Sequence, residues 1–275
     1  MPELPEVETI CRDLKKSVVG ERIKEVVIFD HRVIRFPKPA EFQSQLRGAW
    51  IKGIERRGKA LILEMATSRR KRRFLVVQLM MTGQLVCSAQ EQKTALTRLT
   101  FLLCNKDHLH YNDQRLFGRL YLVNDLNEIS YFQSLGPEPL AKDFVCSGLQ
   151  ERLQKKSTLI KPLLLQHSFV AGIGNIYASE ILFQAHIHPQ RVAKTLCSDE
   201  IEKLYQAIRN ILARAVKRRG TSMNTYRDGY GKRGQFIQEI QVYGRDTKAC
   251  YRCGTPIERM VMQGRSTFFC RWCQA

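Results

Sequence analysis

The amino-terminal residues Met1 to Glu8 carry the first group of side chains that could do chemistry. Proline at position 2 is small enough for the initiator methionine to be removed, and removal would expose a secondary amine flanked by Glu3 and Glu6. Such an amine can attack a carbonyl-like carbon to give an iminium with a fixed positive charge. A neighbouring carboxylic acid can protonate an oxygen during the attack. The alternative is structural, because proline and acidic residues also suit the first turn of a helix.

Four of the nine cysteines form a second chemical group. Two residues separate Cys250 from Cys253, sixteen residues follow, and the same spacing recurs in Cys270 and Cys273. Two close pairs of thiolates can complete a tetrahedral Zn²⁺ site, and a site with four protein ligands has no open position for catalysis. The spacing therefore predicts one structural Zn²⁺ ion that folds a small terminal hairpin.

Charge and cysteine usage indicate the partner and the compartment. The chain has 45 Lys and Arg against 26 Asp and Glu, and the net charge of +19 favours a polyanionic partner, most often nucleic acid. The remaining five cysteines are scattered singly, which is typical of reduced thiols. The acidic amino terminus is unlike a targeting segment, and no run of about 18 apolar residues could span a bilayer. We therefore expect a cytoplasmic protein with no membrane association.

The elements that must position these groups follow from the hydrophobic pattern. Apolar residues at steps of three and four predict an amphipathic helix that begins near Leu4, and short β-rich runs after it predict a β-sandwich. Gly136-Pro137-Glu138-Pro139 marks a domain boundary, after which the pattern becomes helical. The glycine-rich segment from Thr221 to Gly234 is expected to be a mobile loop, and Phe236 to Tyr243 a strand. The predicted strands cover residues 23–29, 33–36, 50–55, 60–65, 74–80, 99–104, 109–111 and 119–123, with a solvated hairpin tip at Arg69 to Arg73, and the predicted helices cover 143–155, 157–166, 175–185 and 199–219.

The run Pro2 to Glu8, read as PELPEVE, resembles the start of the formamidopyrimidine-DNA glycosylases, bacterial base-excision enzymes whose nucleophile is the amino-terminal proline. The resemblance extends over essentially the whole chain. It implies an α+β fold in which an N-terminal β-sandwich with flanking helices precedes a helical helix-two-turns-helix domain and a zinc β-hairpin. The implied domains are a catalytic domain (1–135), a linker (136–140), a helical DNA-binding domain (141–235) and a zinc finger (236–275).

Three motifs carry the resemblance into candidate DNA contacts. Lys59, in Arg57-Gly58-Lys59-Ala60, matches a family lysine that contacts phosphate and supports elimination, although a lysine in such a hairpin is ordinarily exposed and inert. Asn175, in Gly172-Ile173-Gly174-Asn175, matches a phosphate-contacting residue beside a helix amino terminus. Arg265, in Gln263-Gly264-Arg265-Ser266, matches the arginine of the zinc hairpin. Lys156 and Lys161 could add phosphate contacts, but ordinary surface lysines are the simpler interpretation.

A second set of motifs bears on how a stacked base is reached. A glycosylase must rotate its target nucleotide out of the duplex and fill the hole, commonly with large apolar side chains. Met81, Arg115 and Phe117 match the family's three void-filling positions, with Arg115 facing the orphaned base. Without the motif, core packing would be the preferred interpretation of Met81 and Phe117. Departures from the family pattern leave the lesion preference open, and they lie at Gln78, Leu96 to Arg98, Gln114, Leu116 and Ser222 to Asn224.

The sequence thus predicts a monomeric, bifunctional DNA glycosylase and apurinic/apyrimidinic lyase that acts on 8-oxoguanine, formamidopyrimidines and abasic sites in duplex DNA. In this prediction Pro2 attacks C1′, Glu3 protonates the opening sugar, Glu6 orients it, Lys59 assists β,δ-elimination and Arg265 binds phosphate, while zinc is the only cofactor. Two alternatives stay open. One is the endonuclease VIII-like excision of oxidised pyrimidines, and the other is a non-catalytic protein that binds damaged DNA.

Overall fold

The computed structural model describes residues 1–66, 72–89 and 93–274 and divides into two compact units. Unit 1 comprises Met1–Gln133 and Arg218–Gln235, and unit 2 comprises Ser134–Lys217 and Phe236–Ala275. The segment 218–235, which the sequence assigned to the helical domain, therefore packs within unit 1. The predicted hairpin tip at Arg69 to Arg73 falls largely outside the described residues.

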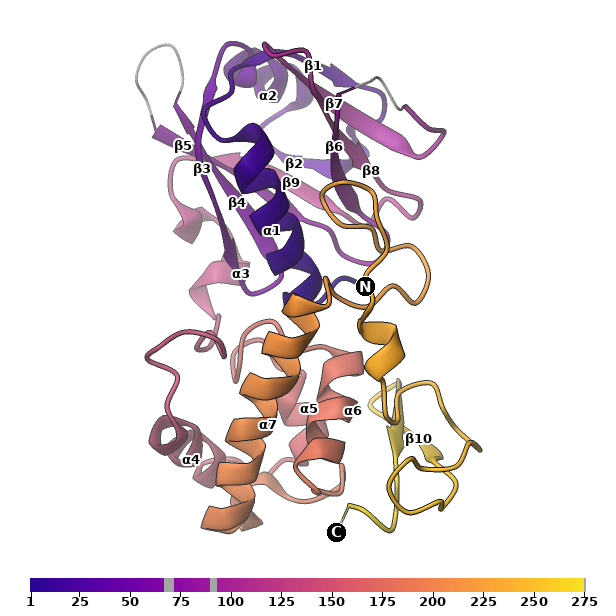
Figure 1. The fold of residues 1–275 in the computed structure, drawn as a ribbon. Coiled ribbons are helices and arrows are strands. Elements are labelled where there is room, and N and C mark those ends of the chain that lie inside the picture. The colour runs from indigo at the N-terminus through magenta and orange to yellow at the C-terminus, as the bar shows by residue number, and fades with distance from the viewer. Residues whose placement is uncertain (67–71, 90–92, 275) are drawn as a thin grey trace. The chain divides into compact units, whose positions relative to one another are not determined.

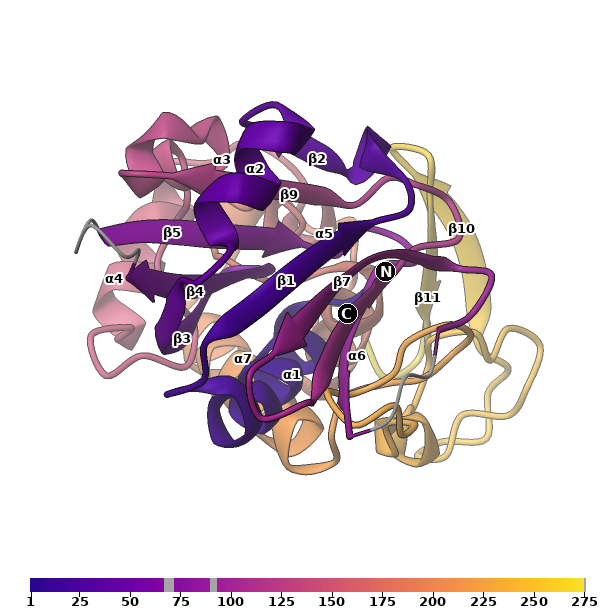
Figure 2. The same cartoon turned by 90° about the horizontal axis from the view of Figure 1, so that it is seen from above.

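Unit 1 contains the predicted β-sandwich (Figures 1 and 2). One sheet has the order β1-β7-β8-β6, with β1 (Ile23–Ile28), β7 (Thr97–Leu103), β8 (His108–Asn112) and β6 (Gln84–Ser88). The other has the order β2-β9-β5-β4-β3, with β2 (Ile34–Phe36), β9 (Arg119–Val123), β5 (Arg72–Gln78), β4 (Ala60–Ala66) and β3 (Trp50–Arg57). Strand pairs are antiparallel except β2 with β9. Inward side chains of both sheets form one hydrophobic core, which is why the alternating patterns fold as two layers.

Helix α1 (Leu4–Val18) packs against β3, β4 and β6 and closes this core. Its stripe of Val7, Ile10 and Leu14 is fully buried, as the three- and four-residue spacing predicted. Burial of each such side chain contributes about 1.5–3 kcal/mol relative to exposure. The helix begins with a capping box formed by Glu3 and Glu6, so the acidic residues of the amino terminus also fix where the helix starts.

The outer face of the five-stranded sheet is covered by the segment that follows β9. Here η2 (Leu126–Glu128) and α3 (Ser130–Gln133) place Ile129 and Tyr131 over a second small apolar cluster. Neither this segment nor helix α2 (Pro39–Leu46) nor strand β6 was predicted from the sequence. Each is short, and short elements carry little periodicity to detect.

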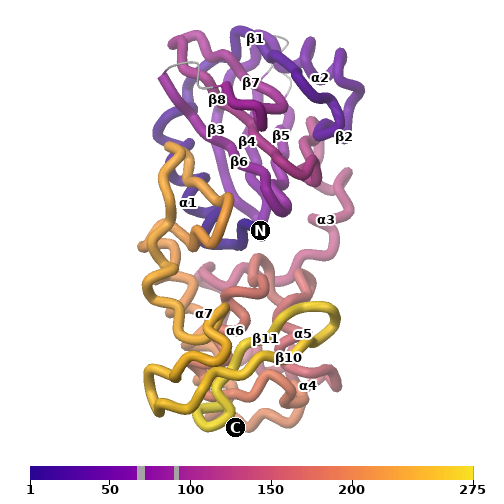
Figure 3. The backbone as a smooth tube through the Cα atoms, turned by 90° about the vertical axis from the view of Figure 1, so that its right-hand side faces the viewer, coloured from indigo at the N-terminus to yellow at the C-terminus, as the bar shows by residue number. Residues whose placement is uncertain are grey.

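Unit 2 combines four α-helices with the terminal hairpin (Figure 3). Strand β11 of the hairpin packs on helix α6. None of the helices within the described part of the chain is both long and apolar enough to cross a membrane. The elements are α4 (Cys146–Gln154), α5 (Ile160–Leu164), α6 (Asn175–Gln184), η3 (Ala193–Thr195), α7 (Ser198–Lys217), η4 (Phe236–Glu239), β10 (Glu258–Met262) and β11 (Arg265–Phe269).

The predicted strand from Phe236 to Tyr243 is wrong, because this segment starts with the 3-10 helix η4. The backbone N–H groups after η4 donate hydrogen bonds to a side chain and not to a neighbouring strand. The buried carboxylate of Glu180 accepts hydrogen bonds from the backbone N–H groups of Gln241, Val242 and Tyr243 at 2.8–3.0 Å. A segment satisfied in this way needs no sheet.

Candidate active site

The two carboxylates of the amino terminus lie buried at the start of α1. Glu3 and Glu6 are only 3% and 2% exposed. The backbone N–H of Glu3 donates to Oε2 of Glu6 at 2.7 Å, and the N–H of Thr221 donates to Oε1 of Glu6 at 2.7 Å. The Glu6 carboxylate is therefore held on both oxygens, and a segment 215 residues away in sequence helps to hold it.

Three charged side chains act electrostatically on the chain's terminal amine, which belongs to Met1, the residue before Pro2. Burial lowers the pKa of this amine below 8.0, Glu3 and Glu6 oppose that change, and Lys59 adds to it. Unit 1 therefore brings the predicted acid, the second carboxylate and the predicted lysine to the amino terminus. A lowered pKa increases the neutral fraction of an amine near pH 7, and the neutral amine is the nucleophilic form.

Lys59 is positioned by the turn between β3 and β4. Gly58 occupies the turn with φ +58°, and the backbone N–H of Lys59 donates to the hydroxyl of Tyr131 at 2.8 Å. Arg56 joins the same turn to α1, since it donates to the Gly58 carbonyl at 3.1 Å and to Glu8 at 2.8 Å. Burial raises the pKa of Glu8, but the Arg56 and Arg12 guanidiniums outweigh it and hold that pKa below its usual range. Lys59 is half-buried and so differs from an ordinary exposed hairpin lysine.

The three predicted void-filling residues project from two adjacent loops of unit 1. Met81 and Phe117 are 36% and 47% exposed, so core packing is the wrong interpretation for both. The Arg115 guanidinium lies 4.6 Å from the Phe117 ring centroid. The loops are joined beneath by Asp113, which is fully buried and accepts hydrogen bonds from the Thr82 hydroxyl, at 2.5 Å, and from the N–H groups of Arg115 and Gly118.

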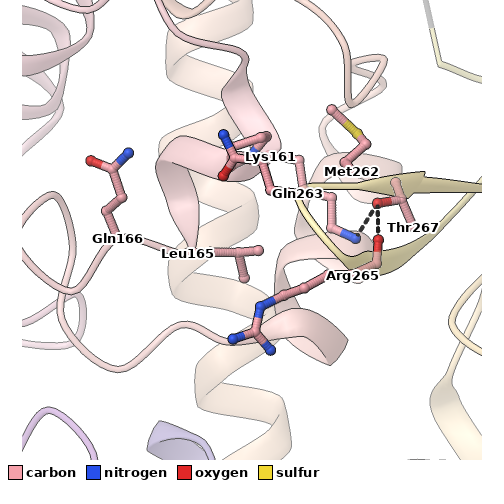
Figure 4. Close-up of a pocket in the computed structure, with 8 residues that line it drawn as sticks. Lys161, Leu165, Gln166, Met262, Gln263, Arg265 and Thr267 are labelled. Carbon is pink, nitrogen blue, oxygen red and sulfur yellow. Dashed lines mark hydrogen bonds between the residues drawn. The ribbon is translucent and has the colours of Figure 1, made fainter.

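In unit 2, Lys161 and Arg265 lie at strand β11 (Figure 4), and Asn175 contacts the same strand. Lys161 is 1% exposed and donates to the Thr267 hydroxyl at 2.8 Å and the Ser266 carbonyl at 3.2 Å, so the surface interpretation is wrong for this lysine. Asn175 donates to the same Ser266 carbonyl at 2.9 Å. Its buried Oδ1 has no hydrogen-bond partner among the described residues. Arg265 is exposed beside them.

A cavity of about 200 Å³ opens at this point between α5 and the hairpin. Its charged lining residues are Lys161 and Arg265, and the others are neutral, so it favours an anion such as phosphate. Lys156 does not line it, and this residue is exposed after α4 as an ordinary surface lysine would be. Lysine burial could not be read from local spacing, because the Thr267 and Ser266 partners lie more than 100 residues away.

The four predicted zinc ligands form one cluster at the base of the hairpin. The sulfur atoms of Cys250, Cys253, Cys270 and Cys273 all lie within 4.8 Å of one another. Separations of 3.9 Å for the Cys250–Cys273 pair and 3.5 Å for the Cys253–Cys270 pair are compatible with four Zn–S bonds of about 2.3 Å. The residues present therefore fit one structural Zn²⁺ ion.

Family models match three successive parts of the chain. Residues 1–120 match the formamidopyrimidine-DNA glycosylase N-terminal domain, residues 135–227 match the formamidopyrimidine-DNA glycosylase H2TH domain, and residues 248–275 match the zinc finger found in FPG and IleRS. The formamidopyrimidine-DNA glycosylase of Symbiobacterium thermophilum is 44% identical over 100% of this chain and 89% of its own length. The chain belongs to the formamidopyrimidine-DNA glycosylase family.

Solved structures agree with this assignment. A Lactococcus lactis FPG mutant in complex with DNA that contains Fapy-dG superposes with a TM-score of 0.91 at 36% identity over 99% of both chains. MutM (FPG) from Thermus thermophilus gives 0.88 at 38% identity over 99% of this chain and 98% of its own. The enzymes of this family are DNA glycosylases and abasic-site lyases, so the chain is an enzyme of base-excision repair with one structural zinc.

Several residues that shape this glycosylase's site were not predicted from the sequence. Thr221 donates a hydrogen bond to Glu6 and Tyr131 accepts one from Lys59, and no local sequence pattern predicts such pairs. Asp113 is different, because it stands at the start of the motif that contains Arg115 and Phe117. A carboxylate at the base of a tight loop commonly caps the loop's N–H groups, and this signal could have identified it.

Gly118 provides a test of how tightly the void-filling loops are packed. A Cβ at this position would lie 1.5 Å from the Tyr111 hydroxyl and 2.9 Å from Asp113, and both neighbours are buried. Gly118→Ala is expected to lower the free energy of unfolding by about 3 kcal/mol, at the upper end for overpacking. Chemical denaturation measures it. Gly53→Ala is the matched control, because its Cβ would meet only Glu64, at 3.9 Å, and near-equal stability of the two variants would contradict this packing.

Proposed function

We propose that this glycosylase excises 8-oxoguanine and formamidopyrimidines from duplex DNA through a covalent intermediate on Pro2. The observation that carries the proposal is the grouping of Glu3, Glu6 and Lys59 around the chain's terminal amine. Removal of Met1 leaves the Pro2 nitrogen as the terminal amine among the same charged groups. The family assignment makes oxidised purines the expected substrates, and solved relatives from Lactococcus lactis contain Fapy-dG or abasic-site DNA.

Base excision would use the amine and the first carboxylic acid. The neutral Pro2 nitrogen attacks C1′ of the damaged nucleotide, the N-glycosidic bond breaks, and the base departs with the proton that the amine loses. Glu3 protonates the ring oxygen, so the sugar opens and an iminium forms between Pro2 and C1′. Glu6 is held by the N–H groups of Glu3 and Thr221, and we assign to it the stabilisation of the developing positive charge.

Strand cleavage would follow from the iminium. Its positive charge acidifies the C2′–H bond, and loss of that proton expels the 3′ phosphate by β-elimination. A second elimination expels the 5′ phosphate, and hydrolysis then frees the Pro2 amine. Lys59 is the cation that we assign to phosphate binding and to assistance of these steps, because it shares the electrostatic environment of the amine. No step requires the zinc ion.

DNA binding would use both units. We assign Met81, Arg115 and Phe117 to the void left by the rotated nucleotide and Asn175, Lys161 and Arg265 to the backbone, with Lys156 as an outer contact. Zn²⁺ bound by the four cysteines supplies the fold of the hairpin that carries Arg265. The net charge of +19 supports duplex DNA as the partner of a monomeric protein, and the bacterial cytoplasm, where this DNA lies, is the proposed location.

Borohydride trapping tests the nucleophile. Borohydride reduces an iminium to a stable amine, so incubation with 8-oxoguanine or abasic-site DNA is expected to give one covalent protein–DNA adduct. Mass spectrometry of the digested adduct should locate the link on the Pro2 nitrogen. An adduct on Lys59 would replace Pro2 as the nucleophile, and the absence of any adduct would remove the covalent mechanism.

A panel of lesions tests the substrate class. Single-turnover excision of 8-oxoguanine opposite cytosine is expected to be faster than excision of thymine glycol from an otherwise identical duplex. Arg115 is suited to the orphaned cytosine, because a guanidinium donates to the acceptors on that base. A preference for thymine glycol would favour the endonuclease VIII-like alternative while leaving the covalent chemistry intact.

A further inference from the structure

An ion-pair cluster ties the loop after α7 to the middle of α1 within unit 1. The Arg219 guanidinium donates to Oδ2 of Asp13 at 2.5 Å and to Oδ2 of Asp228 at 2.5 and 2.9 Å. Asp13 is 4% exposed and Asp228 is fully buried. Buried ion pairs lose much of their attraction to desolvation, so their clearest contribution is to fix one geometry. We call Asp13, Arg219 and Asp228 the Arg219 clamp.

Both carboxylates of the Arg219 clamp also hold the backbone of the loop. Asp13 accepts the N–H of Gly229 at 3.1 Å, and Oδ1 of Asp228 accepts the N–H groups of Tyr230 and Lys232 at 3.0 and 2.8 Å. One guanidinium therefore fixes two carboxylates that in turn fix the loop from 228 to 232. These hydrogen bonds hold the end of the loop from 228 to 232.

The backbone conformation of Arg219 connects the Arg219 clamp to Glu6. Arg219 has φ +61° and Gly220 has φ +78°, and the left-handed region is unfavourable for a residue with a Cβ. These two residues end the path of α7 and turn the N–H of Thr221 onto Glu6, 2.7 Å from Oε1. The turn is tight, because a Cβ on Gly220 would lie 2.8 Å from the same oxygen. The ion pairs of Arg219 thus retain a turn that its own side chain disfavours.

Asp13 and Glu6 are seven residues apart on α1, which places both carboxylates on one face, two turns apart. The loop is attached to that face at both points, by Thr221 and by Arg219. We propose that the Arg219 clamp is a positioning device that holds the Thr221 N–H against Glu6 and so sets the carboxylate geometry at the reactive terminus. The proposal rests on the role assigned above to Pro2 and Glu6.

Arg219→Gly tests the Arg219 clamp, because glycine relieves the left-handed backbone while it deletes the guanidinium. Single-turnover excision of 8-oxoguanine at saturating enzyme is expected to slow by about 10- to 100-fold, which is typical of a misplaced catalytic group. Arg219→Lys should recover part of the rate. The matched control is Lys106→Gly, since Lys106 also has a positive φ, of +74°, and is exposed in the turn between β7 and β8. Its rate should equal that of the wild type.

Asp13→Asn separates the Arg219 clamp from a direct phosphate contact by Arg219, whose side chain is 39% exposed. A lost phosphate contact raises Kd and reduces its salt dependence without changing the saturated rate. Asp13 has the wrong charge to bind phosphate, so a slowed saturated rate with unchanged Kd in both variants supports the clamp. Kd is measured by titration with DNA that contains a reduced abasic-site analogue, and the same titration shows that each variant is folded.

Two outcomes would overturn the positioning role proposed for the Arg219 clamp. One is wild-type saturated rates in both Arg219→Gly and Asp13→Asn, and the other is a change confined to Kd. Borohydride trapping of the wild type in the same series distinguishes failure of this proposal from failure of the Pro2 mechanism. A wild type that is trapped on Pro2, beside an Arg219→Gly variant that reacts equally fast, defeats the clamp and leaves the nucleophile in place.

Discussion

Replacement of Pro2 by glycine is expected to slow 8-oxoguanine excision, and the rate of adduct formation with it, by on the order of 100-fold, or about 2.7 kcal/mol in barrier. Glycine also permits removal of the initiator methionine, so the variant still presents a terminal amine near Glu3 and Lys59. That amine is primary, so it forms a neutral imine that must gain a proton before it withdraws electrons. The secondary amine of proline forms an iminium that carries its positive charge without gaining a proton. Single-turnover excision and borohydride trapping on the same duplex measure the two effects together.

Pro5→Ala is the matched control for this experiment. Pro5 lies in the first turn of α1, and the contact of its carbonyl with the Thr9 hydroxyl, at 2.8 Å, survives the change. Excision should therefore stay close to the wild-type rate. Protein that retains Met1 has Pro2 in a peptide bond, where the nitrogen is not nucleophilic, and should be inert. An undiminished adduct in Pro2→Gly, or full activity with Met1 in place, would disprove the assignment.

The sequence was sufficient for the elements whose signals are local. Helix α1 follows from its apolar spacing, and the described strands of the two sheets, apart from β6, follow from short β-rich runs. The zinc site follows from four cysteines in two close pairs, because the metal itself enforces their convergence. In each case the residues that determine the element lie within a few positions of one another or share one strong ligand.

Contacts between distant segments explain what the sequence could not supply. Thr221 and Glu6 are 215 residues apart, and a threonine N–H has no sequence signature. The end of α7 at Lys217, two residues before its predicted end, follows from the left-handed Arg219 and Gly220. The segment 221–234 was predicted as a mobile loop from its lack of aliphatic residues. Polar side chains of α1 hold it at Thr221 and Gly229, and contacts of this kind leave no hydrophobic pattern.

The family resemblance was informative for Lys59, where the local pattern was not. Lys59, in isolation, is an ordinary hairpin lysine, yet the structure places it in the electrostatic environment of the terminal amine. Lys161, by contrast, was interpreted as an ordinary surface lysine, and only the structure shows that it is buried against Thr267. A resemblance carries information on tertiary neighbours that spacing along one segment lacks. The motifs that carry the resemblance do not include Arg219, so its ion pairs were found only in the structure.

Loss of the zinc ion is expected to have the second large effect, confined to DNA binding by unit 2. The hairpin core holds only a few apolar side chains, among them Phe183, Val242, Ile257 and Phe268, so the metal must supply much of its folding free energy. Without it, Ser266 separates from Lys161 and Asn175, and Arg265 loses its fixed position. The two charged phosphate contacts affected are those of Lys161 and Arg265. Their loss, at about 1.5 kcal/mol each, predicts about a 100-fold weaker affinity for lesion DNA.

Cys253→Ser against Cys197→Ser isolates this effect, because both cysteines are exposed and only Cys253 belongs to the cluster. Either change therefore costs little in packing, and a large difference in DNA affinity between the two variants is due to loss of the metal. Zinc content should fall from one ion per chain to none in Cys253→Ser alone, with loss of protease resistance confined to residues 248–275. Equal DNA affinity in a zinc-free Cys253→Ser protein would show that the hairpin folds without the ion, since unit 1 has its own core and stays folded in either case.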